Sequence, residues 1–304
     1  MQSIDTAHIQ ANDGNMLILQ LCLAFILFSL AIDIKKDDFK TVFTNPKAVL
    51  IGCISQMVLL PLLTFILILF LKPAPSIALG MILVAACPCG NMSTYISYLA
   101  RGFVPLSITI TTISTLSASF STPFSFYLYA SHYAPAAEIL HTIQIDFFDL
   151  LKSVVLILFI PLILGIVAKA FFPVIVQKMN KPVKILALLL FVAFLLVAFI
   201  LNRRVFIEFL PVIFGVVFIQ NALAFFTGYG FAKIFKLPED QSRSISIETG
   251  IHNSGLGLIL VMTFFKGNGG MALIAAWWGI WHILAGVSLA QFWRWRDQRA
   301  SSRL

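Results

Sequence analysis

The strongest constraint on this chain is a succession of apolar runs, each about 20 residues long, that extends from Asn15 to Trp293. A helix of that length and composition spans the hydrocarbon core of a bilayer, so each run predicts one transmembrane helix. The nine predicted spans are Asn15–Ala31, Ala48–Leu71, Ser76–Ala100, Pro105–Ala130, Phe148–Phe171, Val183–Leu201, Phe209–Phe235, Ser242–Phe265 and Gly269–Trp293. Only 11% of the residues are charged, against about 25% in soluble domains. The expected fold class is an all-α polytopic membrane protein.

Basic residues are distributed unevenly over the predicted loops. The odd-numbered loops and the C-terminal tail hold 16 of the 21 Lys and Arg residues. Because short cytoplasmic loops are enriched in Lys and Arg, this side is predicted to be cytoplasmic, with the N-terminus outside and the C-terminus inside. We therefore expect a multi-pass protein of the cell inner (cytoplasmic) membrane. The net charge of +8 reflects topology rather than nucleic-acid binding, and no protein partner is evident.

Two of the predicted spans are interrupted by polar residues and glycines. The third is interrupted at Cys87–Thr94 and the eighth at Ile247–Gly255. Broken backbone at membrane depth is tolerated only where it lines a cavity or is buried in protein. Each interruption lies in the third of four consecutive spans, and one isolated span separates the two sets. The halves would therefore be inverted relative to each other, an arrangement common in secondary transporters.

The side chains that carry chemistry are few. Glu248 is the single acid near the centre of a predicted span, and a bound cation is its natural partner, although a protonated, hydrogen-bonded acid is the alternative. Hydroxyl oxygens are offered by Ser93, Thr94, Ser107, Thr111, Thr112 and Ser114. Ser107 and Thr111 lie four residues apart and share one helix face, as a site built from one side of a helix requires. Individually, such hydroxyls more often bond to a carbonyl of their own helix.

Buried amides form a second group of polar side chains. Gln56 lies in the middle of the second span, and the pair Gln220-Asn221 lies in the middle of the seventh. Each amide is either a ligand or a link between helices, a role that polar residues often take in membrane bundles. Cys87 and Cys89 are not spaced as a CxxC motif, so they indicate a metal site only weakly.

These residues lie in motifs that resemble one known family. Cys-Pro-x-Gly and Ser-x-x-x-x-Tyr-Leu-Ala-Arg-Gly, within Cys87–Gly102, resemble the first broken helix of the bile acid:sodium symporter family. Ser-Ile-Glu-x-Gly-x-x-Asn-Ser-Gly-Leu, at Ser246–Leu256, resembles its second broken helix. Further matches are Asn45-Pro46-Lys47, Gln56 with Pro61-Leu62-Leu63, Leu106-Ser107 and Trp281-His282. The resemblance covers almost the whole chain.

The resemblance implies one transporter unit over residues 1–304. Its core domain, approximately 48–130 and 209–293, would contain two crossing broken helices. Its panel domain, approximately 15–31 and 148–201, would move against the core. The family usually has nine or ten helices, and nine are expected here.

The resemblance also implies ligands for one or two Na⁺ ions and for an organic anion. The first sodium site would fall on Ser93, Thr94, Ser107, Thr111 and Glu248. The second would fall on Gln56, Glu248 and His252, with the carbonyls of Thr249 and Ile251. The substrate anion would meet Asn91, Met92, Ser93, Asn253, Ser254 and His282.

The chain departs from the family pattern at four of these positions. Thr94 stands where the family typically has Asn, and His252 stands where it has Gln. Asn91 and Cys89 replace the preferred Thr and Gly. Histidine supplies a nitrogen, which is a poor ligand for an alkali cation, and it titrates near neutral pH.

The expected function is import of an organic anion, either bile-acid-like or a small carboxylate, by alternating access and coupled to sodium. Two alternatives remain open: a proton-coupled or uncoupled carrier, because of Thr94 and His252, and an intramembrane enzyme. The enzyme would use Glu248 and His252 as an acid–base pair, but no nucleophile or cofactor motif accompanies them.

Overall fold

The structure is a computed structural model of the chain, and it describes residues 4–5, 24–25, 28, 31–32, 40–90, 92–143, 147–201 and 203–301. Within these ranges the regular elements are helices, and the extended backbone pairs at one isolated antiparallel bridge. The elements in chain order are α2 (Lys40–Thr44), α3 (Pro46–Ile54), η2 (Ser55–Leu59), α4 (Leu60–Leu71), α5 (Pro75–Ala86), α6 (Met92–Leu99), α7 (Val104–Ser131), α8 (Ala134–Ile143), α9 (Phe147–Phe171), α10 (Pro173–Leu201), α11 (Arg203–Ile234), α12 (Glu239–Gly250), α13 (Ser254–Phe264) and α14 (Gly269–Ser301). The all-α expectation is confirmed for this part of the chain.

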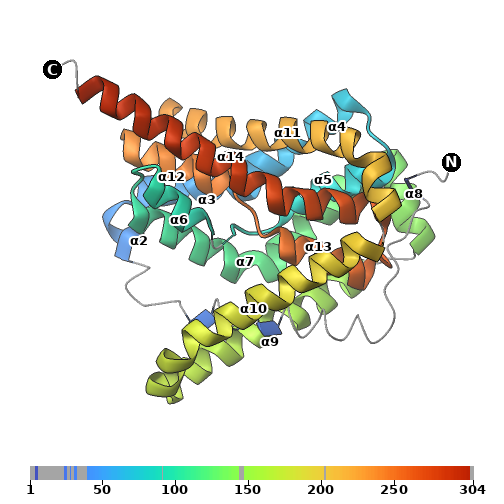
Figure 1. Cartoon of the computed structure of the whole chain (residues 1–304), viewed down its shortest axis with the longest axis horizontal. Coiled ribbons are helices and arrows are strands. Elements are labelled where there is room, and N and C mark those ends of the chain that lie inside the picture. Colours follow the sequence, from blue (N-terminus) through green and yellow to red (C-terminus); the bar gives the residue numbers. More distant parts are fainter. Residues whose placement is uncertain are drawn as a thin grey trace.

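The larger body of the molecule encloses the two interrupted helices. α5 and α13 lie inside it, and every residue from Ser76 to Ala86 and from Ser254 to Met262 is buried. Both segments are apolar around most of their circumference, as expected of helices with neighbours on all sides. α9 and α10 lie together along one side of this body, and α11 and α14 lie on the opposite side (Figure 1). The interrupted backbone is thus buried in protein, as membrane depth requires.

The helices match most predicted spans in position, with differences mainly at their ends: α11, for example, begins at Arg203 rather than near Phe209. The helix predicted from Val183 begins at Pro173, and the last helix continues to Ser301 rather than ending near Trp293. The predicted loop from Ser131 to Phe147 contains α8. The apolar runs mark only the lipid-facing length of a helix, whereas polar residues extend the hydrogen-bonded helix beyond it. The span predicted at Asn15–Ala31 lies largely outside the described residues.

Three helical stretches among the described residues are long and apolar enough to cross a membrane without interruption. They are Pro46–Leu71, Ile207–Ile234 and Gly269–Ala300. The first joins α3, η2 and α4, and its middle turn is a π-helix that contains the buried Gln56. Single π-turns inside helices often occur at functional sites, so this turn supports a functional role for Gln56.

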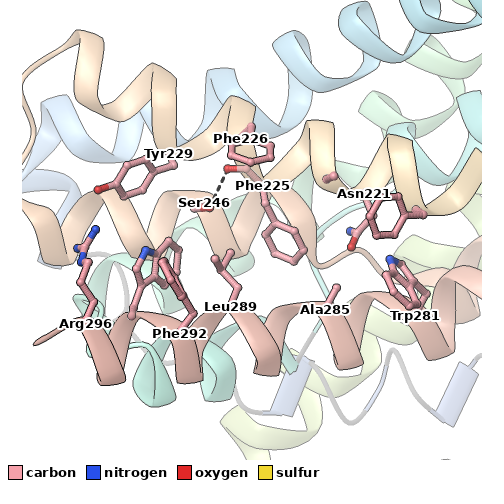
Figure 2. A pocket seen from close by; sticks show the side chains of 13 residues that line it. Asn221, Phe225, Phe226, Tyr229, Ser246, Trp281, Ala285, Leu289, Phe292 and Arg296 are labelled. Atoms are coloured by element: carbon pink, nitrogen blue, oxygen red, sulfur yellow. Dashed lines mark hydrogen bonds between the residues drawn. The ribbon is translucent and has the colours of Figure 1, made fainter. Parts of the chain in front are cut away.

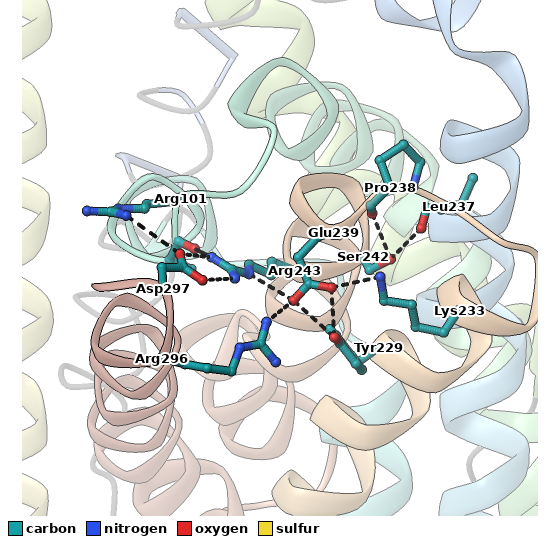
Figure 3. A network of polar contacts seen from close by, with 11 residues as sticks. Arg101, Tyr229, Lys233, Leu237, Pro238, Glu239, Ser242, Arg243, Arg296 and Asp297 are labelled. Atoms are coloured by element: carbon teal, nitrogen blue, oxygen red, sulfur yellow. Dashed lines mark hydrogen bonds and ion pairs between the residues drawn. The ribbon is translucent and has the colours of Figure 1, made fainter. Parts of the chain in front are cut away.

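The C-terminal extension of α14 takes part in a cluster of charged residues (Figure 3). Asp297 accepts two hydrogen bonds from the buried Arg243 of α12, at 2.6 and 2.8 Å. The Nε atom of Arg243 lies 3.2 Å from a carboxylate oxygen of Glu239. The guanidinium carbon lies 5.6 Å from the centroid of the Trp293 ring. The same arginine donates to the carbonyl of Ala100 at 3.0 Å, which joins α12 to the end of α6. This cluster fixes the charged ends of both interrupted helices to α14.

Candidate functional site: the crossing of two broken helices

The two interruptions meet each other. The amide of Gly90 donates to the carbonyl of Ile251 at 2.9 Å, and the amide of Asn253 donates to the carbonyl of Pro88 at 2.9 Å. Cys89 and His252 form the antiparallel bridge between them. The backbone groups released by the two breaks therefore satisfy one another, as buried amides and carbonyls require.

Local sequence explains why each helix breaks there. Pro88 disfavours helical conformation at the residue before it, and Cys87 has φ −69° and ψ 152°, in the extended region. In the second break, Asn253 begins the new helix, because its side-chain oxygen accepts the amide hydrogen of Leu256 at 3.0 Å. Gly90 permits the close approach, since a Cβ at that position would lie 3.0 Å from the carbonyl oxygen of His252.

Glu248 lies next to the crossing, two residues before the end of α12, and is completely buried. Its carboxylate accepts a hydrogen bond from Ser107 and a second from Thr111, the latter at 2.7 Å. The Thr111 hydroxyl is 3.2 Å from that of Ser93, and the Ser107 hydroxyl is 3.4 Å from that of Thr94. The structure thus brings together all five residues expected at the first sodium site, from α6, α7 and α12.

The chemistry of this cluster suits a hard monovalent cation. It offers two carboxylate oxygens and four hydroxyl oxygens, and hard cations of groups 1 and 2 prefer oxygen ligands. Within the described part of the chain, no Lys, Arg or His side chain forms an ion pair with Glu248. A buried carboxylate without a protein cation needs either a bound cation or a proton.

The residues expected at a second cation site also gather beside the crossing. The Gln56 amide nitrogen donates to the carbonyl of Cys87 at 3.1 Å, while its side-chain oxygen is buried without a protein partner. The Thr249 hydroxyl donates to the carbonyl of Ile245 at 2.8 Å. The Ser55 hydroxyl lies 2.9 Å from the same Thr249 hydroxyl. Gln56 therefore links helices through its amide nitrogen, and its free side-chain oxygen could still bind a cation. The two roles expected for Gln56, interhelical link and ligand, are compatible.

His252 occupies the middle of this second group. Its Nδ1 lies 2.9 Å from the carbonyl oxygen of Val84, and its Nε2 lies 3.0 Å from that of Thr249. The Thr249 carbonyl, one of the oxygens expected to bind the second cation, thus lies within hydrogen-bond distance of the imidazole. The carbonyl of Ile251, the other expected oxygen, accepts the amide of Gly90.

The residues expected to meet the substrate are placed less uniformly. Asn91 lies outside the described residues, and Met92 begins α6 and is 40% exposed. Asn253 and Ser254 lie at the crossing itself, where Ser254 packs against Gly279 of α14. His282, on α14, is buried with its Nδ1 unpaired. Its ring meets the edge of Trp278, which in turn packs against His252.

Several contacts at the crossing are not evident from the sequence. Asn221, an amide whose role the sequence leaves open, donates to the carbonyl of Gly250 at 2.8 Å, and Gln220 donates to the carbonyl of Met81 at 2.9 Å. Ser55 gives no signal beyond its position next to Gln56. The Cys89 backbone amide donates to Ser114 at 3.2 Å. Tertiary packing alone selects these partners.

Comparison with known proteins identifies the family of the chain. A family model described as the sodium bile acid symporter family matches residues 20–209. This chain belongs to that family. It is 33% identical to the uncharacterized sodium-dependent transporter YocS of Bacillus subtilis over 89% of this chain and 81% of that one. It is 31% identical to the probable chloroplastic sodium/metabolite cotransporter BASS2 of Oryza sativa, over 92% of this chain and 65% of that longer one.

A third relative is the probable chloroplastic sodium/metabolite cotransporter BASS1 of Arabidopsis thaliana, which is 28% identical over 90% of this chain and 65% of its own. The chain thus spans slightly less than two thirds of the length of these two plant proteins. As a member of the sodium bile acid symporter family, it is a multi-pass membrane transporter of a sodium-dependent family and not an enzyme. The acid–base role considered for Glu248 and His252 is therefore set aside.

Proposed function

We propose that the protein imports an organic anion, bile-acid-like or a small carboxylate, by alternating access and coupled to sodium bound at Glu248. The observation that carries the proposal is the buried Glu248 carboxylate, which Ser107 and Thr111 contact directly and which has hydroxyl groups of α6 close by. A sodium ion there would neutralise a charge that the membrane interior otherwise disfavours. Ser93, Thr94, Ser107, Thr111 and Glu248 form the proposed site.

The anion would bind beside the same crossing. α6 and α13 both begin there, and the positive dipole end at the N-terminus of a helix favours an anion. Met92, Ser93, Asn253, Ser254 and His282, together with Asn91, form the proposed anion site. Cation and anion would then stabilise the same crossing geometry, and the coupling between them is reciprocal.

The proposed alternating access assigns residues 48–130 and 209–293 to a core and residues 15–31 and 148–201 to a panel. Two amide contacts support an inverted repeat: Gln56 binds the carbonyl of Cys87 after α5, and Asn221 binds the carbonyl of Gly250 at the end of α12. In each half of the chain, an amide side chain thus donates a hydrogen bond to a carbonyl at the end of the first segment of the broken helix. We place the protein in the inner membrane, with its N-terminus on the outer side and its C-terminus on the cytoplasmic side.

Thermal unfolding of the purified protein in sodium, potassium or choline chloride tests the cation site. We expect sodium alone to raise the melting temperature, and Glu248→Gln to abolish that rise. Glu239→Gln, which changes an acid at the other end of α12, is the matched control and should keep the sodium response. Equal melting temperatures in all three salts would contradict sodium binding.

Uptake into proteoliposomes tests the substrate class. A labelled steroid acid, hydroxy acid and keto acid would each be offered with and without an inward sodium gradient. We expect one class to accumulate only with the gradient, and neutral analogues not to accumulate. Equal accumulation with and without the sodium gradient would contradict sodium coupling. Uptake of the neutral analogue alone would contradict an anionic substrate.

The position of His252 favours a second candidate, in which a proton replaces the second sodium ion. Both ring nitrogens face carbonyl oxygens, at 2.9 and 3.0 Å. A neutral imidazole donates to one of them only, whereas the doubly protonated ring donates to both. Melting temperatures at about pH 6 and pH 8 bracket the usual histidine titration. A pH response that His252→Gln removes, with no sodium response, would favour this carrier.

A further inference from the structure

The clearest cavity in the described part of the chain lies away from the crossing. It has a volume of about 390 Å³ and lies between α11 and α14 (Figure 2). These helices form the side of the body opposite α9 and α10 (Figure 1). Its rim carries exposed aromatic rings, among them Phe226, which is 77% exposed, and Phe292, which is 52% exposed. Rings exposed on membrane-spanning helices face lipid, so the cavity opens toward the bilayer.

The cavity is polar at one end and apolar along most of its length. Arg296 and Tyr229 lie at one end, and Trp281 lies at the other (Figure 2). Fifteen residues of α14 separate Trp281 from Arg296, which is about 22 Å at 1.5 Å per residue. One leaflet of the hydrocarbon core is about 15 Å thick, so the cavity is long enough to follow one leaflet from its surface inward.

The polar end carries an excess of positive charge (Figure 3). Lys233 at 2.7 Å, Arg243 at 3.2 Å and Arg296 all engage the single carboxylate of Glu239. One carboxylate cannot neutralise three cations, and Asp297 is already held by Arg243. The Arg296 side chain remains 44% exposed. An anion that arrives from the membrane surface therefore meets uncompensated positive charge at the mouth of an apolar channel.

We propose that this cavity is a binding site for an anionic phospholipid. Its phosphate lies at Arg296 beside Tyr229 and Trp293, and one acyl chain extends between α11 and α14 toward Trp281. With the C-terminus in the cytoplasm, this lipid belongs to the inner leaflet, where anionic headgroups attract basic residues near the surface. Aromatic residues at this depth are typical of the bilayer interface.

The cavity wall touches the crossing, so the lipid also bears on transport. A Cβ on Gly250 would lie 2.3 Å from the Phe225 ring, which shows how closely this ring of the wall packs on the end of α12. Asn221, at the deep end of the cavity, donates to the Gly250 carbonyl. Gly250 is two residues from Glu248. The acyl chain thus supports the two side chains that hold the end of the first half of the broken helix.

Lipid titration of the purified protein tests the site independently of transport. Short-chain phosphatidylglycerol, phosphatidylcholine with the same chains, and glycerol phosphate would each be titrated against the melting temperature. We expect phosphatidylglycerol to stabilise the protein at lower concentration than phosphatidylcholine. Arg296→Gln should raise the phosphatidylglycerol concentration that gives half of the maximal stabilisation by about fivefold, which is the loss of affinity expected for one basic residue at a membrane surface. Ala285→Phe, which fills the cavity, should abolish the stabilisation.

Two controls separate the site from general effects. Lys47→Gln removes an exposed basic residue of α3 that lies outside the Glu239 cluster and does not line the cavity, and Leu284→Phe adds the same ring as Ala285→Phe at an exposed position of α14 outside the cavity. Both should keep the wild-type response. Equal responses to the two lipids, or an unchanged response in Ala285→Phe, would overturn the proposal. Stabilisation by glycerol phosphate alone would assign the site to a soluble anion instead.

Cross-linking of the wild-type protein in bilayers covers the case in which a variant fails to fold. Phosphatidylglycerol with a photoreactive group in the middle of one acyl chain should label peptides that contain Phe225 or Leu289. The phosphatidylcholine analogue should label them several-fold less. Equal labelling by both lipids, or labelling of other helices only, would overturn the proposal.

Discussion

The backbones of Cys89 and His252, which are 163 residues apart, pair as an antiparallel bridge at the centre of the molecule. The pairing exists because both helices break at the same depth, and each break supplies the hydrogen-bond partner of the other. It is also close, because no side chain separates the two strands at Gly90. The crossing is thus a single unit, and changes to either break should affect both.

Gly90→Ala tests this closeness. The new Cβ would lie 3.0 Å from the His252 oxygen and 3.2 Å from its carbonyl carbon, and both are backbone atoms that cannot rotate away. We expect a loss of about 1–3 kcal/mol in the free energy of unfolding, the usual range for overpacking, together with reduced sodium binding. Gly230→Ala is the control, because nothing lies within 4 Å of its Cβ. Equal melting temperatures for the two variants would contradict the argument.

Asn221→Leu tests the amide that closes α12. The substitution introduces an apolar side chain of similar size and leaves the buried Gly250 carbonyl without its donor. An unsatisfied buried acceptor costs about 1–3 kcal/mol, and a corresponding fall in melting temperature is expected. Gln241→Leu provides the comparison, since that amide donates to Asn45 in a partly exposed position. A fall for Gln241→Leu as large as that for Asn221→Leu would show that burial is not the cause.

Arg243→Gln tests the charged cluster. It removes both hydrogen bonds to Asp297 and the contact with Glu239, and Arg243 is itself 4% exposed. Asp297 retains some contact with solvent, so we expect destabilisation of about 2–3 kcal/mol, in the range of hydrogen bonds to charged groups. Arg101→Gln loses an exposed pair to the same Asp297 at 3.7 Å and should cost less than about 1 kcal/mol. Denaturant titration of the two variants would reveal the difference.

Glu239 predicts a pH dependence of stability. Burial raises the pKa of this carboxyl, but hydrogen bonds from Lys233, Tyr229, Arg296 and Arg243 outweigh it and lower the pKa from 4.5 to about 2. A lowered pKa in the folded state means that the ionised form contributes stability above the unfolded value of 4.5 and loses it as pH falls toward 2. The stability difference between wild type and Glu239→Gln should be constant near neutral pH and shrink below pH 4.5. A difference that grows on acidification would contradict this sign.

Thr111→Val tests the proposed sodium site with little change in shape. It removes the hydroxyl that lies 2.7 Å from the Glu248 carboxylate. We expect the sodium concentration for half-maximal stabilisation to rise about tenfold, as for the loss of one charge-assisted contact. Thr115→Val, one turn further along α7 at a buried position, should leave this concentration unchanged. The same shift in both variants would indicate a general effect of α7 rather than a ligand.

Much of this protein follows from local patterns in its sequence. Apolar runs of bilayer length predict the helices, and Pro88 and Asn253 mark where two of them break, because their effects on backbone conformation are local. Glu248 and six hydroxyl residues stand out as polar groups at membrane depth, and the resemblance of their motifs to the family selects the five residues proposed for the first cation site.

The tertiary structure decided the partners. Which carbonyl each of Gln56 and Asn221 binds depends on how helices pack, and the pairing of Arg243 with Asp297 depends on a helix that continues beyond its apolar part. The same holds for the imidazole of His252, which lies between two carbonyls that no spacing predicts. These contacts join residues far apart in the chain, and hydropathy carries no information on which helix faces meet. The sequence by itself determined the helices and their breaks, and only packing determined what each polar group touches.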